Sequence, residues 1–307
     1  MGSLRRTAIT DTLRTTCAVL AAWVYAAACA QAQPLFSSST LPGLSPANPV
    51  PVLQREPSQP LRYRMIVLAG DGCAGLPPPL ARSLASLPHA QLLVLYKPGV
   101  DPLAGPGSCA PGFTQRDSLS RWQESARAAL RADARAQTGS TPVPQLLVGV
   151  AEGINLLPGL AAEVPRLAGL VLLQGSGLDP LEAGVLQAQR SGQLAAWQAL
   201  DEAQHSDAPD SSEVQGRSLR YWRDLWRWHT ARPLAESEWP ILQLWGDADA
   251  QVPAAAYLRF AERAAGRSAP LCTRHITGDV QGLQQLGLWL ERWAQAPSSG
   301  LCQATAP

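Results

Sequence analysis

The sequence has almost no excess of charge, because 25 Lys and Arg residues stand against 24 Asp and Glu residues, for a net charge of +1. This balance argues against a nucleic-acid partner, which normally requires a basic face. Lysine is nearly absent: Lys97 is the single one, and we expect it to be solvated in the segment YKPGV. The four histidines do not cluster and no CxxC pair occurs, so we expect no metal site and no cofactor.

The sequence also lacks an apolar run long enough to span a membrane. The stretch CAVLAAWVYAAACA (17–30) follows three arginines and reaches an A-x-A sequence at 30–32, a pattern typical of an export signal. We therefore expect residues 1–32 to be a signal peptide and the mature protein to be periplasmic or secreted. A lipoprotein anchored through Cys29 is the alternative.

The predicted mature chain keeps four cysteines, Cys73, Cys109, Cys272 and Cys302. An even number in an exported protein indicates two disulfide bonds. Four cysteines allow three pairings, and proximity in the sequence favours Cys73 with Cys109 and Cys272 with Cys302.

Strand and helix patterns alternate along most of the chain. Residues 33–60 are rich in Pro and Ser and are expected to form a linker or an irregular strap, and residues 297–307 a tail. Helices are predicted at 79–87, at 117–137 with Asp117 as N-cap, and at 282–295. Continuous apolar strands alternating with helices predict an α/β domain over 61–296, with a mostly parallel sheet covered by helices on both faces. The apolar runs lie at 64–70, 90–96, 145–150, 168–175, 240–246 and 271–277.

A polar, Trp-rich stretch at 178–239 separates the fourth and fifth predicted strands. We expect a helical lid insertion over the carboxyl edge of the sheet, where ligands bind in such folds. Trp222 and Trp226 are one helical turn apart, with arginines beside them. They indicate either a lid helix packed on the core or a wall that stacks against a sugar or peptide ligand.

The order of the motifs resembles the α/β-hydrolase fold, and specifically bacterial serine hydrolases with a G-x-S-E-G elbow, over roughly residues 61–296. VLAGDGCAG (67–75) stands where that family has its oxyanion loop, which places Gly70, Asp71 and Gly72 at the pocket. GVAEG (149–153) stands at the elbow, with Ala151 at the nucleophile position and Glu152 after it.

The resemblance also assigns the other two positions of a catalytic triad. GDADAQVP (246–253) is similar to the segment that carries the acid and matches it at Asp249. TGDVQG (277–282) stands at the histidine turn and puts Gln281 at the histidine position. The order nucleophile, acid, histidine is the expected one for the fold, but only the acid type is retained.

The substitutions remove the chemistry of acyl transfer. Ala151 has no oxygen to attack a carbonyl, and the amide of Gln281 neither accepts nor releases a proton near neutral pH. Loss of a whole triad costs on the order of 10⁶ in rate in a serine protease. Gln281 can still donate to Asp249, and the backbone N–H of Glu152 still favours an anion, so a shaped polar pocket is expected to remain.

These features predict a catalytically inactive, exported protein that binds a small molecule or a partner in the pocket where its relatives carry the catalytic triad. The alternative is an ester or peptide hydrolase with relocated chemistry, using Asp249 with Glu152, His229 or Cys73. A third hypothesis is a structural role, in which the lid surface docks another exported protein. Ser176 and His275 are weaker candidates, interpreted as a loop serine and a packed or edge histidine of a strand.

Overall fold

The computed structural model describes residues 35–70, 72–104, 107–139, 142–246, 252–276 and 280–296, with only the backbone for 280–284. The chain divides into two compact units, of which Phe36–Pro307 contains all the elements described here. The predicted signal peptide and the predicted tail lie outside the described residues. None of the helices in these ranges is long and apolar enough to cross a membrane.

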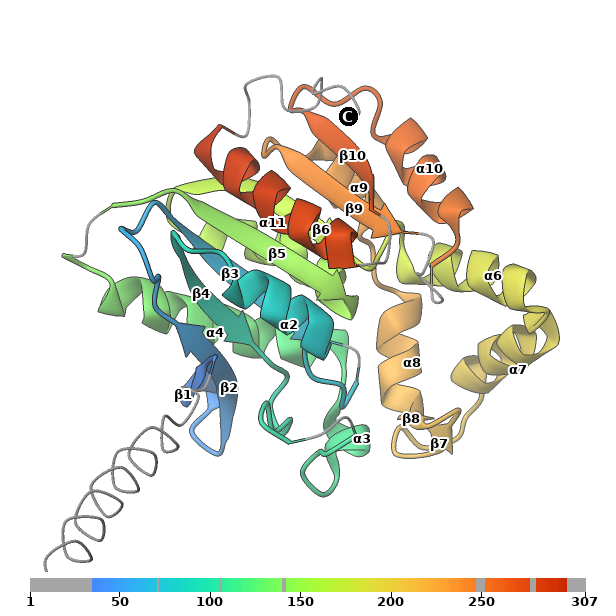
Figure 1. Cartoon of the computed structure of the whole chain (residues 1–307). Helices are drawn as coiled ribbons and strands as arrows, with labels where there is room; N and C mark the ends of the chain where they lie inside the picture. The colour runs from blue at the N-terminus through green and yellow to red at the C-terminus, as the bar shows by residue number, and fades with distance from the viewer. Residues whose placement is uncertain are drawn as a thin grey trace, which may run out of the picture. The chain divides into compact units, whose positions relative to one another are not determined.

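The core of this unit is an eight-stranded sheet with the strand order β1-β2-β4-β3-β5-β6-β9-β10 (Figure 1). The six apolar runs form six parallel strands, as predicted, and β1 and β2 are antiparallel. The strands are β1 Ser37–Ser45, β2 Asn48–Arg55, β3 Tyr63–Gly70, β4 Ala90–Leu95, β5 Gln145–Ala151, β6 Leu167–Leu173, β9 Ile241–Gly246 and β10 Leu271–Ile276.

The first two strands were not expected, because residues 33–60 were predicted to be a linker or strap. Instead β1 and β2 form a hairpin, and β2 pairs with β4 to extend the edge of the sheet. Val50 and Val52 are fully buried, two residues apart on one face of β2. The Pro and Ser content of the segment conceals this short alternation.

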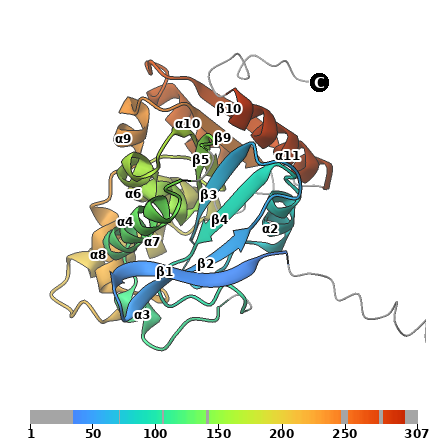
Figure 2. The same ribbon diagram turned by 90° about the vertical axis from the view of Figure 1, so that its left-hand side faces the viewer.

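Helices cover both faces of the sheet, as predicted (Figure 2). Side chains of β3 alternate between the two faces: Met65 and Val67 belong to a core cluster with α2 and α11, while Ile66 and Leu68 belong to a cluster with α4. α5, α9 and α10 also contribute to the second cluster. These helices are α2 Pro78–Ala85, α4 Leu119–Ala136, α5 Leu157–Leu160, α9 Ala231–Glu236, α10 Ala254–Arg263 and α11 Val280–Gln295.

The N-cap of α4 is Ser118 rather than Asp117, which corrects the prediction. The Ser118 Oγ accepts a hydrogen bond from the backbone N–H of Arg121. Asp117 precedes this N-cap residue, and its carboxylate is used in the site described below. Both residue types are good caps, so composition alone does not distinguish them.

The insertion between β6 and β9 is helical, as expected. It holds four helices and a small antiparallel pair of strands. They are α6 Pro180–Ser191, α7 Leu194–His205, β7 Glu213–Val214, β8 Arg217–Ser218, α8 Leu219–Trp226 and α9. α8 contacts α4 and α9 contacts α5, so the insertion packs on the core of the unit.

The connections of the sheet diverge between β3 and β5. The chain leaves β3 through α2 to reach β4 on one side, and returns through α3 (Phe113–Arg116) and α4 to β5 on the other side. The carboxyl ends of β3 and β5 therefore flank a topological switch point, where open α/β sheets bind their ligands. Gly70 at the end of β3 is paired in register with Ala151 at the end of β5.

Candidate functional site

The chain turns sharply at Ala151, between β5 and the short helix η1 (Glu152–Leu156). Ala151 has φ 50° and ψ −120°, a conformation that L-residues rarely adopt. A Cβ on Gly149 would lie 2.6 Å from the Cα of Ile154, and one on Gly153 would lie 2.1 Å from the backbone oxygen of Leu68. Both glycines are thus required by close packing. The sequence 149–153, here called the elbow, has the strained strand-to-helix geometry that holds a nucleophile in hydrolytic enzymes.

The elbow opens onto a cavity of about 730 Å³ at the carboxyl ends of β3, β5, β6 and β9. This volume is typical of small-molecule sites. Ala151 and Glu152 line it from the elbow, and Gly70 lines it from β3. The walls are mostly apolar and include Leu76, Leu80, Ile154, Leu178, Leu225 and Trp245.

Glu152 is held from behind the cavity by two buried partners. Its Oε2 lies 2.7 Å from the Nζ of Lys97, and its Oε1 accepts a hydrogen bond of 2.6 Å from the hydroxyl of Tyr221 in α8. Only 2 % of the Lys97 side chain and 9 % of the Glu152 side chain are exposed. The prediction that Lys97 is solvated is therefore wrong.

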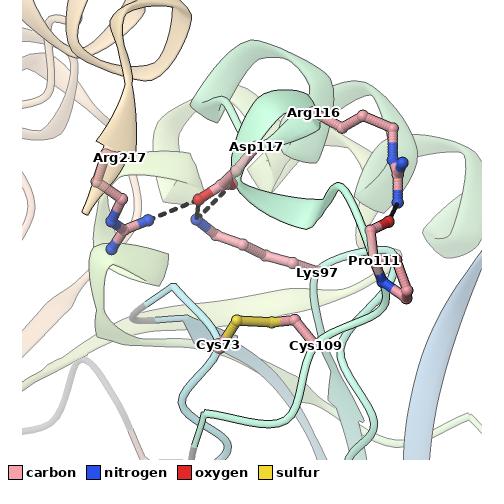
Figure 3. The surroundings of a disulfide bond; sticks show 7 residues. All are labelled: Cys73, Lys97, Cys109, Pro111, Arg116, Asp117 and Arg217. Atoms are coloured by element: carbon pink, nitrogen blue, oxygen red, sulfur yellow. Dashed lines mark hydrogen bonds and ion pairs between the residues drawn. A yellow bond between two sulfur atoms is a disulfide. The ribbon is translucent and has the colours of Figure 1, made fainter. Parts of the chain in front are cut away.

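The same ammonium also contacts Asp117, as Figure 3 shows. Lys97 donates to both carboxylate oxygens of Asp117, at 2.8 and 3.1 Å, and Arg217 from β8 donates to Oδ2 at 2.6 Å (Figure 3). Lys97, Asp117, Glu152, Arg217 and Tyr221 form what is called here the charge network. The charges of two cations and two carboxylates balance in this network. The network connects the end of β4, the start of α4, the elbow and the insertion.

The charge network fixes the ionisation of Glu152. Burial alone raises the pKa of this carboxyl, but the nearby Lys97 and Arg217 and the hydrogen bonds from Lys97 and Tyr221 lower it to about 2. Burial, followed by the charge of Glu152, raises the pKa of the Tyr221 hydroxyl well above its ordinary value. Near neutral pH Glu152 is a carboxylate that is ion-paired at Oε2 and hydrogen-bonded at Oε1, and its low pKa makes it a weak general base.

The predicted pair of Cys73 and Cys109 is disulfide-bonded, with the two Cα atoms 5.6 Å apart (Figure 3). The bond links the segment after β3 to the loop that follows Lys97. Cys272 also takes part in a disulfide, while Cys302 lies outside the described residues, so that second pairing stays a prediction. A disulfide leaves Cys73 without a thiolate to act as nucleophile.

The other predicted site residues are only partly placed. Gly70, Ala151 and Glu152 come together at the cavity, and Gly72 lies beside Arg217, with an added Cβ 2.9 Å from its guanidinium. Asp71 and Asp249 lie outside the described residues. Gln281 belongs to the first turn of α11, but its side chain is not described.

The described candidates for relocated chemistry, His229, Ser176 and His275, do not meet at the elbow. His229 follows α8 with 76 % of its side chain exposed, and its Nδ1 lies 3.5 Å from Asp179. Ser176 lines the cavity, but its Oγ accepts from the backbone N–H of Leu178 at 3.2 Å. His275 is exposed on the edge strand β10 and makes an edge-to-face contact with Trp245, which agrees with a packed or edge histidine. Among the described lining residues there is no histidine, and the described residues contain no cluster of His, Cys, Asp and Glu able to hold a metal.

The tryptophans of α8 are used within the insertion. Trp226 stacks on Trp197 with ring centroids 5.0 Å apart and donates to Asp201. Trp222 donates to the backbone oxygen of Val214. Both are partly buried against the core and neither is among the residues lining the cavity, which favours packing over ligand stacking.

We expect Lys97→Met to lower the free energy of unfolding by about 3–5 kcal/mol, because it leaves two buried carboxylates without their shared cation. Urea-induced unfolding measures this. Glu163→Gln is the matched control: it removes a carboxylate that pairs with the exposed Arg131, and should cost about 1 kcal/mol or less. Equal losses in the two variants would contradict a buried, coupled network.

Glu152 also gives a defined pH dependence. Its pKa in the folded protein, about 2, is below its ordinary value of 4.5, so its stabilisation is present above pH 4.5 and is lost as the pH falls toward 2. The difference in unfolding free energy between wild type and Glu152→Gln should be about 3 kcal/mol at pH 7. It should shrink as denaturation is repeated at lower pH. A difference that stays constant from pH 7 to 3 would argue against the lowered pKa.

Comparisons with known proteins agree on the architecture. No protein-family model and no curated protein matches the sequence. Solved structures do match. The acylaminoacyl peptidase of Pyrococcus horikoshii gives a TM-score of 0.58 at 11% identity, over 85% of this chain and 42% of that chain. A soluble variant of monoglyceride lipase from Saccharomyces cerevisiae, in complex with a substrate analog, gives 0.57 at 11% identity, over 87% and 97%.

Est1E from Butyrivibrio proteoclasticus gives a TM-score of 0.53 at 13% identity, over 87% of this chain and 99% of that chain. At such identities the likeness concerns the fold alone. The mostly parallel sheet, its helices on both faces and the elbow at the end of β5 agree with it. The chain therefore has the α/β-hydrolase fold.

Proposed function

We propose that this protein is a non-catalytic, exported member of its fold that binds a small molecule in the cavity at the elbow. The observation that carries the proposal is Ala151: the residue at the strained corner of a well-formed cavity offers only a methyl group. A hydrolase of this fold needs an oxygen or sulfur atom there, activated by a base.

The surroundings of Ala151 support binding over relocated chemistry. Glu152 is engaged by Lys97 and Tyr221 with a pKa of about 2, which leaves it a weak base. Cys73 is oxidised, and His229 is exposed outside the cavity lining. The assignment of Gln281 to the histidine position, made from the sequence, removes the remaining proton acceptor.

The cavity itself supports a small-molecule ligand. Its volume of about 730 Å³ and its mostly apolar lining are properties of ligand sites rather than of packing defects. The charge network ties α8 and β8 to the core and holds this wall of the cavity in place without a ligand. A preformed site loses little conformational entropy on binding.

Export is part of the proposal. The Cys73–Cys109 disulfide supports an oxidising compartment, where such bonds persist. Together with the predicted signal at residues 1–32, this favours a periplasmic or secreted protein, with the lipoprotein at Cys29 as the alternative.

We expect that a fluorophosphonate probe does not label the natural protein. We also expect that 4-nitrophenyl butyrate is hydrolysed at the same rate with the protein as in buffer alone. Ala151→Ser/Gln281→His, which rebuilds the predicted triad, should gain labelling. Gel fluorescence and absorbance measure the two signals. Labelling of the natural protein would remove the non-catalytic proposal, whereas an unlabelled double variant would contradict only the position assigned to the histidine.

Binding is tested separately with prodan, a neutral naphthyl ketone whose emission shifts in an apolar site. The natural protein should bind it, and Ala183→Trp, which fills the cavity from α6, should reduce the affinity at least about tenfold. Ala195→Trp on the exposed face of α7 is the matched control and should bind as the natural protein does. Equal binding by all three would place the dye elsewhere and speak against the cavity.

A further inference from the structure

Two strained residues lie beside each other at the cavity. Val150 pairs with Leu173 in register, so Ala151 and Gln174 follow at the ends of neighbouring strands. Gln174 has φ 57°, a positive value like that of Ala151, and it lines the cavity. Such conformations cost free energy for residues other than glycine, and they gather at functional sites.

The Gln174 amide is available to a ligand. Asn155, Ser176 and Tyr221 of the lining already donate or accept hydrogen bonds within the protein, and Gln187 also interacts there. The Nε1 of Trp245 and the Oε1 of Gln187 are buried without a hydrogen-bond partner among the described residues, but only the amide of Gln174 leaves both its donors and its acceptor unused there. Gln174 lines the cavity and is exposed, and its side chain makes no hydrogen bond to any other described residue. Its amide carries two donor hydrogens and an acceptor oxygen.

The charges around the cavity disfavour an anion. No Lys, Arg or His is among the described lining residues, and every basic residue after position 36 belongs to the described ranges. Arg190, which is not among these lining residues, donates to the backbone oxygen of Val252. The one acid among these lining residues, Glu152, is already paired. A carboxylate ligand would be buried without a counter-charge, next to a carboxylate.

We propose that the cavity selects an uncharged ligand and that the Gln174 side-chain amide hydrogen-bonds its carbonyl or hydroxyl group. This rests on the proposed binding function and adds the ligand's chemistry. The apolar walls bind its hydrocarbon part, and Gln174 is the specificity-determining residue for its polar group.

Charge selection is tested by comparing prodan with the matching dimethylamino-naphthoate, in which a carboxylate replaces the propionyl group. A carboxylic acid with a pKa of about 4.5 must bind in its protonated form, so at pH 7.5 the naphthoate should bind about 10²–10³-fold more weakly. Its affinity should rise about tenfold for each pH unit between 7.5 and 5.5. Prodan binding should not change over this range.

Gln174 is tested by Gln174→Gly, with Arg166→Gly as the matched control. Arg166 is exposed, has φ 52° and does not line the cavity, so both variants relieve the same kind of strain. Neither should lower the Tm. Gln174→Gly should bind prodan about three- to tenfold more weakly, as expected for one lost hydrogen bond, while Arg166→Gly should bind it unchanged.

The outcomes separate this inference from the proposed function. Absence of prodan binding by the natural protein overturns both. Prodan binding with equally strong naphthoate binding at pH 7.5 overturns charge selection. Unchanged prodan affinity in Gln174→Gly, or a Tm that falls without a change in affinity, shows a structural role and overturns the assignment of Gln174.

Discussion

The site depends on one buried ammonium group. Lys97 is 2 % exposed and contacts the carboxylates of both Asp117 and Glu152. A lysine in this position loses its hydration, which is tolerated only because two carboxylates surround it and aromatic rings of Trp122 and Tyr221 lie within 5.1 and 5.6 Å. Because these partners come from α4, the elbow and the insertion, one interaction fixes the mutual position of three segments that are distant in the sequence.

This constraint has a chemical consequence at the elbow. The carboxylate next to Ala151 is ion-paired with Lys97 and hydrogen-bonded by Tyr221, so it anchors the corner and does not serve the cavity as a base. The geometry of a catalytic corner is therefore maintained by forces unrelated to catalysis: the close approach of Gly153 to Leu68, the buried ion pairs and the disulfide behind them. A fold can retain a shaped pocket after its attacking atom is gone, because different interactions support the two.

Patterns that are local in the sequence predicted the fold well. The six apolar runs, the elbow and the Cys73–Cys109 bond were identified because each is determined by nearby residues or by short loops. Lys97 was misjudged because its burial depends on Arg217 and Tyr221, more than a hundred residues away, and no spacing rule records such contacts. Gln174 was missed for a related reason: its role depends on backbone conformation and on unpaired hydrogen-bonding groups, which composition does not reveal.

The two strained corners then become informative together. Ala151 adopts an unfavourable φ, and its methyl group makes no polar interaction that would compensate for the strain. The packing of η1 against β3 must therefore impose this φ. Gln174 adopts a similar φ at the next strand, and its polar side chain has no hydrogen-bond partner in the described part of the chain. At Ala151 the packing enforces the strained backbone whatever the side chain is. At Gln174 the strained backbone carries an amide at the cavity, and a ligand that completes the hydrogen bonds of this amide would bind more tightly. For this reason we assign recognition of the ligand's polar group to Gln174, and only a role in the shape of the cavity to Ala151.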